Sequence, residues 1–389
     1  MQLWQSKLQV VVKRDVFICL IIAVLWQLSM TIVGFAFDHD LDPSASLLGH
    51  IMHWDAGWYL SVISDWYASN LASAAFYPLY PLAVWTVSLF GIINIPVAAL
   101  LVNTICLFFA LLALLRITHI LIGGKLSYLP VLLLFAFPSA FFMHVFYTES
   151  LFIAIGLWAY LFALQKKWWQ MGILLALITA CRLPGLLIVA LCSLEFYRAH
   201  AWNLKQAFKD KNVLTFLLAP IGFLFYGSYL FLTTGDGLGM LHAYQHTDDW
   251  AYQQFNINIF ETIFRAGHQP IKAFLGVRPL DNDIIVNHLI PFVSLVLIAA
   301  SSLYFLLVAK KKFIPIGFYG LLSIVLFTLN NNVVSVHRYA LPVFGVYLFG
   351  ALLWHKYKKA RPFILIATTL SFILQLVLYS RFIGDIFAG

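Results

Sequence analysis

The sequence predicts an all-α polytopic membrane protein, because the chain is apolar, poor in charge and divided into long hydrophobic runs. Hydrophobic residues make up 62% of the 389 positions and charged residues only 10%, whereas soluble domains carry roughly a quarter charged residues. The mean hydropathy is +0.89. Apolar runs that can cross about 30 Å of hydrocarbon recur from Val16 to Tyr379. We therefore expect a single integral membrane domain over residues 1–389, without a soluble domain.

Apolar windows indicate the membrane-spanning helices, and we expect about eleven of them, within a range of roughly 10–13. The windows cover residues 16–37, 95–118, 128–146, 149–165, 168–181, 184–197, 213–233, 288–309, 313–330, 339–354 and 363–380. Lys7, Lys13 and Arg14 precede the first window, and no small-residue cleavage site follows it. This pattern favours a retained signal anchor with its N-terminus in the cytoplasm.

One further segment, residues 77–93, is ambiguous. If it does not cross the membrane, the basic segments between the windows all face the cytoplasm, as the positive-inside rule predicts. Those segments include Lys166–Lys167, residues 198–211, Lys310–Lys312 and residues 356–361. We therefore expect residues 77–93 to form a surface or dipping helix within a first external loop, at about residues 38–95. A second long external loop is expected at about residues 234–287.

The formal charge of +8 comes largely from Lys and Arg concentrated in these short segments. Such a distribution sets membrane topology and does not form a surface that follows a phosphate backbone, so no nucleic-acid partner is expected. Cys19, Cys106, Cys181 and Cys192 lie in or beside apolar segments without close pairing. That arrangement argues against disulfides and zinc sites and favours packing roles.

Asp55 is a candidate general base in the sequence HWDAGWY, residues 53–59, which follows the first expected span. Trp54, Trp58 and Tyr59 can partly desolvate its carboxylate, which would make it a better base. A helix N-cap or a solvated loop acid is the simpler interpretation from spacing alone. The aromatic residues are equally typical of an interfacial belt.

The sequence AFYPLYP, residues 75–81, places two prolines three residues apart between aromatic side chains. This spacing favours a turn that enters a helix. The same segment, with Tyr80, could shape a groove for a lipid chain or a sugar.

Glu149 lies at the boundary between two spans, where an acid near a helix N-terminus is stabilised by the helix dipole. Helix capping is therefore its simplest role.

Two arginines lie on the face that the expected topology places outside. Arg182 occupies the turn between two short spans, and Arg338 lies in the sequence His337-Arg338-Tyr339. A guanidinium offers paired donors that suit a phosphate. The alternative is that these side chains extend to the membrane interface.

Two acidic segments raise the question of a metal. Asp38, Asp40 and Asp42 form two overlapping DxD patterns, and Asp248–Asp249 lie in a loop that also contains three histidines, His242, His246 and His268. Either segment could hold a divalent ion. Both patterns are short and unspecific, and a solvated loop explains them equally well. We therefore expect no cofactor, with a divalent metal as the alternative that is not favoured.

Four segments, in order along the chain, resemble the motifs of the PIG-V family, the GPI mannosyltransferase 2 group and its bacterial relatives. They are HWDAGWYLSVISDWYASNLASAAFYPLYPLAV, FPSAFFMHVFYTESLF, ALITACRLPGLL and HRYALPVFGVYL. The resemblance covers most of the chain. Gly345 replaces the second proline of the family's last motif, and the Arg that often follows the family's Trp is absent after Trp250. These departures concern the acceptor or the loop geometry rather than the class.

The resemblance implies a GT-C type glycosyltransferase that transfers mannose, or a similar hexose, from a polyprenyl-phosphate donor to an acceptor glycan or glycolipid with inversion. One carboxylate suffices as base, because a phosphate leaving group needs no protonation. The resemblance assigns this role to Asp55 and the stabilisation of the lipid phosphate to Arg182 and Arg338. The other expected substrate-binding residues are Trp54, Tyr59, Tyr80, Glu149 and His337.

The main rival is a multi-pass transporter or flippase for a lipid-linked sugar. Transporters place ionisable residues near the middle of the membrane, whereas the charges here cluster at the expected helix ends and in loops. A non-catalytic subunit that binds a lipid-linked sugar is a second rival, and it would not need Asp55. The resemblance and the compact loops favour a bacterial cytoplasmic membrane, or the endoplasmic reticulum membrane in a eukaryote, with the active site on the external or lumenal side.

Overall fold

The computed structural model describes residues 13–37, 48–68, 71–123, 128–246, 250 and 253–389. Within these residues all regular elements are helices, and an isolated bridge joins Phe255 and Asn330. The all-α prediction is therefore confirmed. The candidate metal residues at 38–42 and Asp248–Asp249 lie outside the described residues.

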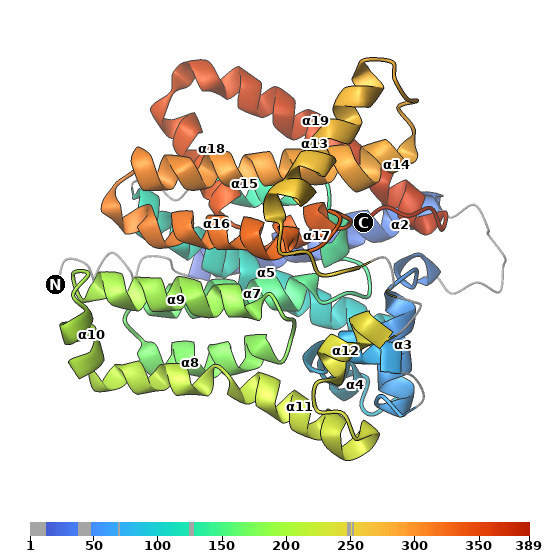
Figure 1. Cartoon of the computed structure of the whole chain (residues 1–389), viewed down its shortest axis with the longest axis horizontal. Helices are drawn as coiled ribbons and strands as arrows, with labels where there is room; N and C mark the ends of the chain where they lie inside the picture. Colours follow the sequence, from blue (N-terminus) through green and yellow to red (C-terminus); the bar gives the residue numbers. More distant parts are fainter. Residues whose placement is uncertain (1–12, 38–47, 69–70, 124–127, 247–249, 251–252) are drawn as a thin grey trace.

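The longer helices form the body of the molecule, and most of them run in nearly the same direction (Figure 1). They are α2 (Lys13–Phe37), α5 (Ile95–Ile122), α7 (Glu149–Leu164), α8 (Trp168–Thr179), α9 (Gly185–Ala199), α11 (Ile221–Thr234), α15 (Ile290–Leu307), α16 (Ile314–Thr328), α18 (Gly345–Lys356) and α19 (Arg361–Ile383). Helix α7 packs against α5, α8 and α9, while α15 packs against α16.

Shorter helices complete the fold. They are α3 (Ala56–Asp65), α4 (Leu79–Val87), α6 (Leu129–Phe135), α10 (Leu204–Lys209), α12 (Gly239–His246), α13 (Ile259–Phe274), α14 (Asn282–Ile284) and α17 (Val336–Ala340). Helices α3, α4 and α12 gather at one end of the body, and α10 lies at the other end (Figure 1). The segment after the first span thus carries short helices, as the sequence predicts.

Six described helical stretches are long and apolar enough to cross a membrane. They are Arg14–Phe37, Ile95–Ile122, Lys211–Thr234, Asn282–Leu307, Lys311–Thr328 and Lys358–Ile383. Helices α7 and α8 are shorter apolar helices. The chain is therefore an integral membrane protein.

Proline breaks two of the expected spans. Residues 128–146 form only the seven-residue helix α6, followed by a 3-10 turn over Ala140–Met143. Pro138 separates these elements, because proline has no N–H and disfavours a helical residue before it. Pro342 likewise separates α17 from α18. The hydropathy windows at 128–146 and 339–354 therefore do not correspond to continuous helices, and both broken regions lie beside the candidate site.

Helix α4 bears on the ambiguous segment at residues 77–93. It has nine residues, which rise only about 14 Å at 1.5 Å per residue. Leu89 and Phe90, which follow it, have positive φ angles of 53° and 60°, so the helix cannot continue. A helix of this length is too short to cross about 30 Å of hydrocarbon, in agreement with the predicted surface or dipping helix.

Candidate active site

Four charged side chains from distant parts of the chain form one network. Arg338 Nη1 donates to Asp55 Oδ2 at 2.6 Å, and Arg338 Nε donates to Glu149 Oε1 at 2.8 Å. Arg182 Nη1 donates to the same Glu149 oxygen at 2.6 Å. The two carboxylates and two guanidinium groups balance in charge, which is the condition for placing ions in a poorly solvated site.

Asp55 immediately precedes helix α3, yet its side chain makes no capping hydrogen bond. The carboxylate instead pairs with Arg338. The backbone N–H of Asp55 donates to the Tyr147 hydroxyl at 2.9 Å, and that hydroxyl donates to the His53 carbonyl at 3.3 Å. Tyr147 therefore fixes the backbone on both sides of Trp54, which has a positive φ of 56°. Asp55 thus occupies the N-cap position of α3, but its carboxylate does not cap the helix.

Glu149 begins α7, and its side chain is fully buried, whereas 24% of the Asp55 side chain is exposed. The two acids therefore differ in their accessibility to a substrate. Glu149 is surrounded by protein and holds two arginines, so a substrate cannot easily reach it. Asp55 remains accessible to a substrate hydroxyl while its other side pairs with Arg338.

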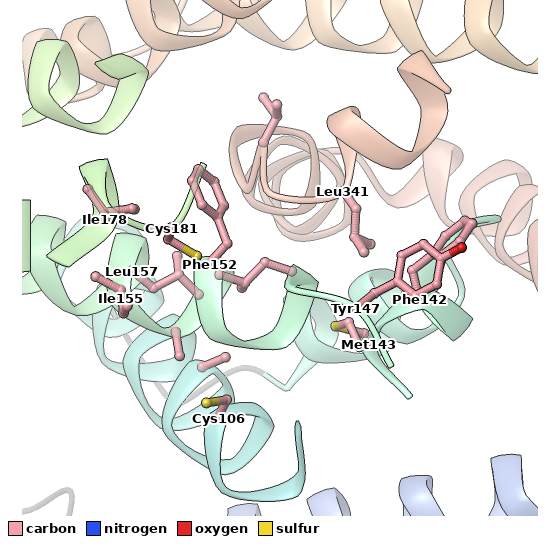
Figure 2. Close-up of a cluster of buried hydrophobic side chains, with 14 of the residues drawn as sticks. Cys106, Phe142, Met143, Tyr147, Phe152, Ile155, Leu157, Ile178, Cys181 and Leu341 are labelled. Atoms are coloured by element: carbon pink, nitrogen blue, oxygen red, sulfur yellow. The ribbon is translucent and has the colours of Figure 1, made fainter. Parts of the chain in front are cut away.

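Arg338 is held from several directions on the short helix α17. Its guanidinium carbon lies 4.7 Å from the Tyr147 ring centroid and 5.2 Å from that of Phe142. Figure 2 shows these two rings side by side in the apolar cluster, with Leu341 directed toward them. Burial lowers the pKa of Arg338, but the carboxylates of Glu149 and Asp55 outweigh burial and raise that pKa well above its ordinary value. The side chain is therefore a permanent cation.

The network borders a cavity of about 900 Å³, which Asp55, Tyr59, Arg182 and Arg338 line together. Arg182 faces the cavity from the turn before α9, and its guanidinium carbon lies 5.2 Å from the Tyr339 ring centroid. A cavity of this size can hold a sugar phosphate together with a second group. One accessible carboxylate and two arginines therefore face the same space.

Besides the buried Glu149, three residues that the sequence nominated do not line this cavity. Trp54 packs edge-on against Phe387, and the Tyr80 hydroxyl donates to Asn103 Oδ1 at 3.2 Å. His337 Nε2 donates to the Ala388 carbonyl at 3.0 Å. Burial lowers the pKa of His337 to about 4, with that carbonyl opposing the shift and Arg338 adding to it. His337 is therefore neutral near pH 7 and adds no cation to the site.

Four further residues line the cavity, and the sequence did not indicate them as site residues. Trp250, Tyr244, Gln254 and Asn330 all line the cavity. The expected topology had placed their two segments outside, but nothing in their spacing indicated which side chains face inward. Tyr147 was also missed. Its position two residues before Glu149, in a segment already linked to a motif, is the signal that could have identified it.

Within the described part of the chain, no group of three or more His, Cys, Asp or Glu side chains could hold a metal ion. His242 pairs with Asp236 at 2.8 Å, and His268 stacks on Phe264. The arginines of the network provide cationic groups that can bind a phosphate without a metal.

Comparisons with known proteins bear on the fold. No protein-family model matches the chain, and no curated protein matches its sequence. The structure is similar to the crystal structure of ArnT from Cupriavidus metallidurans bound to undecaprenyl phosphate, with a TM-score of 0.54 and 12% sequence identity. The match covers 90% of this chain and 62% of the ArnT chain, so this chain spans less than two thirds of that protein. The similarity is one of fold, and it agrees with the all-α membrane fold that the sequence predicts.

Proposed function

We propose that this chain is a glycosyltransferase that moves a mannose or similar hexose from a polyprenyl-phosphate donor to a hydroxyl of a glycan or glycolipid. The observation that carries the proposal is the shared cavity, in which the accessible carboxylate of Asp55 lies beside Arg182 and Arg338. Undecaprenyl phosphate in the structurally similar ArnT supports a lipid-phosphate donor. The PIG-V-like motifs support mannose as the sugar.

In the proposed reaction Asp55 accepts the proton of the acceptor hydroxyl as that oxygen attacks the anomeric carbon. The new carbon–oxygen bond forms on the face opposite the phosphate, so the configuration inverts. The bond from the anomeric carbon to the phosphate oxygen breaks, and the lipid phosphate leaves with the electron pair. Only one base is required, because the phosphate leaves without a proton.

Arg338 is suited to stabilise the transition state because it contacts Asp55 directly. Before reaction its guanidinium neutralises the Asp55 carboxylate. As Asp55 takes the proton, this carboxylate loses its charge while the leaving phosphate gains one. Arg338 can then transfer its electrostatic stabilisation from Asp55 to the phosphate, assisted by Arg182. Such stabilisation is greater in the transition state than in the ground state, which is the requirement for catalysis.

Glu149 is proposed to position both arginines rather than to contact substrate. Its Oε1 accepts from Arg182 and Arg338, and the side chain has no exposed surface. Without this shared acceptor the two guanidinium groups would repel each other and lose their common orientation. This role differs from the substrate-binding role that the family resemblance implies for Glu149.

The Tyr147 hydroxyl gives a prediction about positioning. Tyr147→Phe removes the acceptor for the Asp55 N–H but keeps the ring beneath Arg338. We expect kcat to fall about fivefold, because one buried hydrogen bond contributes about 1 kcal/mol, while the donor KM stays nearly unchanged. The matched control is Tyr160→Phe, since the Tyr160 hydroxyl is buried without a hydrogen-bond partner in the described residues. Steady-state kinetics of both variants check this, and equal kcat values would contradict the role.

The distribution of charge along the helices supports an external site. Glu149 begins α7, and Lys166–Lys167 follow its end; Arg182 precedes α9, whose last turn contains Arg198. Lys310–Lys312 precede α16, which ends near the site. The basic groups thus lie at one end of these helices and the site at the other. By the positive-inside rule the site would face away from the cytoplasm, across a bacterial cytoplasmic membrane.

Cysteine labelling tests this orientation. Ser64→Cys lies on the exposed surface of α3, and Lys311→Cys lies at the basic end. We expect an impermeant maleimide to label the first variant in intact cells and the second only after permeabilisation. The four native cysteines are free and buried, so the background should be low. Labelling of both positions from the same side would contradict the orientation.

The transfer assay tests the function itself. Purified protein in lipid nanodiscs would receive polyprenyl-phosphate mannose with a labelled sugar, together with a panel of glycan and glycolipid acceptors. We expect label to appear on an acceptor, and we expect a chelator to leave the rate unchanged because the arginines bind the phosphate. Intact donor and no labelled acceptor across the panel would instead favour the transporter or binding-subunit alternative. A loss of activity with the chelator would contradict metal independence.

A further inference from the structure

Two segments that are far apart in the sequence form one wall of the cavity. Asn256 N–H donates to the Leu329 carbonyl at 3.2 Å, and Asn331 N–H donates to the Gln254 carbonyl at 2.9 Å. These bonds flank the antiparallel bridge between Phe255 and Asn330. The pair is anchored further by Thr262, whose hydroxyl donates to the Asn330 carbonyl at 2.6 Å. The wall is therefore a fixed element and not two independent loops.

This wall carries amide side chains. Gln253, Gln254, Asn330 and Asn332 line the cavity, and we refer to these four residues as the amide wall. An amide both donates and accepts hydrogen bonds, as a sugar hydroxyl does. Asn330 Oδ1 is buried and has no hydrogen-bond partner among the described residues. A hydroxyl donated from a bound ligand would satisfy this oxygen.

The amide wall differs in charge from the catalytic side of the cavity. Among the described residues, the charged side chains that line the cavity are Asp55, Arg182 and Arg338. The amide wall has no cation to pair with a phosphate or a carboxylate. An anionic group bound there would lose its hydration without gaining a counter-charge, which is strongly unfavourable. The chemistry of the wall therefore favours an uncharged ligand.

An aromatic surface accompanies the amides. Trp250, Tyr244 and Phe76 line the cavity, and the Trp250 ring centroid lies 5.9 Å from that of Tyr244 and 5.6 Å from that of Phe76. Trp250 Nε1 donates to the Ala72 carbonyl at 3.1 Å, which fixes the indole. Ring faces of this kind can contact the C–H face of a pyranose while amides bond its hydroxyls.

We infer that the amide wall binds an uncharged, hydroxyl-rich sugar ring of the acceptor, so that the enzyme selects neutral glycans over phosphorylated or uronic ones. This inference rests on the proposed function for the identity of the ligand as acceptor. The phosphate of the donor is then bound by Arg182 and Arg338, and the acceptor sugar by the amide wall. Asp55 faces the same cavity, in which the acceptor hydroxyl meets the donor.

Equilibrium binding tests the subsite without requiring transfer. The probes are labelled hexyl mannoside, hexyl glucoside and hexyl galactoside, with hexyl glucuronide as the anionic match to the glucoside. Full-length protein in nanodiscs should bind at least one neutral probe, and it should bind the glucuronide at least tenfold more weakly than the glucoside if the glucoside binds. Failure of all three neutral probes to bind, or equal affinity for the glucuronide and a binding glucoside, would overturn the inference.

Two variants locate the binding. Asn330→Leu replaces the amide with an apolar side chain of the same branched shape, and Gln254→Ala alters an exposed side chain that should not affect folding. We expect each to weaken binding of the neutral probe about tenfold. Gln206→Ala, on exposed α10 at the far end of the molecule, is the control and should bind as wild type does. Wild-type affinity in both wall variants would contradict the assignment.

Kinetics separate the two possible sources of the sugar ring. If the amide wall binds the acceptor, the wall variants should raise the acceptor KM and leave the donor KM unchanged. A rise in the donor KM alone would place the donor sugar at the wall and overturn the acceptor assignment. Binding of a neutral probe without any transfer by wild type would support the glycan subsite while contradicting the proposed function.

Discussion

Asp55→Asn is expected to reduce sugar transfer by about 10²–10⁴-fold, the range typical of a lost general base. An amide cannot take up the acceptor proton under these conditions. Its oxygen can still accept from Arg338, and the Tyr147 bond involves the Asp55 backbone rather than its side chain. The fold and the donor KM should therefore be preserved, so the loss should appear in kcat. Initial rates with wild type and variant in nanodiscs provide the measurement.

The matched control lies on the same helix. Asp65 ends α3, and its carboxylate accepts from the Tyr67 N–H at 3.1 Å, away from the arginine network. Asp65→Asn should therefore keep nearly the wild-type rate. Equal transfer by wild type and Asp55→Asn would remove Asp55 from the mechanism, whereas equal losses in both variants would indicate a structural effect of α3.

Arg338→Gln should abolish transfer and also destabilise the protein. Glu149 is fully buried and would lose one of its two cationic partners, while Asp55 would lose its guanidinium. Removal of one member of a buried ion pair typically costs about 3–5 kcal/mol in the free energy of unfolding. Thermal unfolding in detergent and transfer assays should show both losses. An unchanged melting temperature would contradict the importance of the network for stability.

Two further variants separate stability from catalysis. Arg265 pairs with Glu261 on the exposed surface of α13, so Arg265→Gln should cost at most about 1 kcal/mol. The double variant Arg338→Gln, Glu149→Gln removes the cation and its buried anion together. We expect it to recover only part of the lost stability, because Arg182 also loses its buried carboxylate partner. It should recover none of the activity, because the leaving phosphate would still lack Arg338. Recovery of transfer in the double variant would contradict the catalytic role of Arg338.

The sequence was most informative about the membrane-spanning character of the chain and about where its long apolar helices begin. Hydropathy predicted the helices that begin near Val16 and Ile95, because long apolar runs have few other stable conformations in a bilayer. It could not predict the interruptions near Pro138 and Pro342, since averaging over a window hides the loss of one backbone N–H. Both interruptions matter, because Tyr147 and Arg338 lie in the irregular segments beside them.

The candidate site was predictable only in part. The expected topology placed Asp55, Glu149, Arg182 and Arg338 on one face, and the structure brings these four residues into contact. The Asp55–Arg338 pair joins residues 283 positions apart, and no local pattern encodes such a contact. The direction of individual side chains could not be predicted from the sequence either, because it depends on tertiary packing. Packing turns Tyr80 toward Asn103 and brings Gln254 and Asn330 to the cavity.

Glu149 illustrates how burial changes the interpretation of a motif. Its position at a helix start agrees with a capping or dipole role, and the family resemblance implies that it binds substrate. Complete burial between two arginines favours a third role, in which Glu149 fixes the cations that meet the phosphate. Exposure therefore distinguishes the proposed base from the acid that positions the arginines.

The anomeric configuration of the first product tests the central claim most directly, because a single base and a phosphate leaving group permit one displacement. Wild-type protein would transfer isotopically labelled mannose from a polyprenyl-phosphate donor of known configuration to a neutral acceptor, and NMR would determine the new linkage. The mechanism with Asp55 as base predicts a glycoside of configuration opposite to that of the donor. A product of retained configuration would require a covalent or otherwise two-step reaction and would contradict the mechanism.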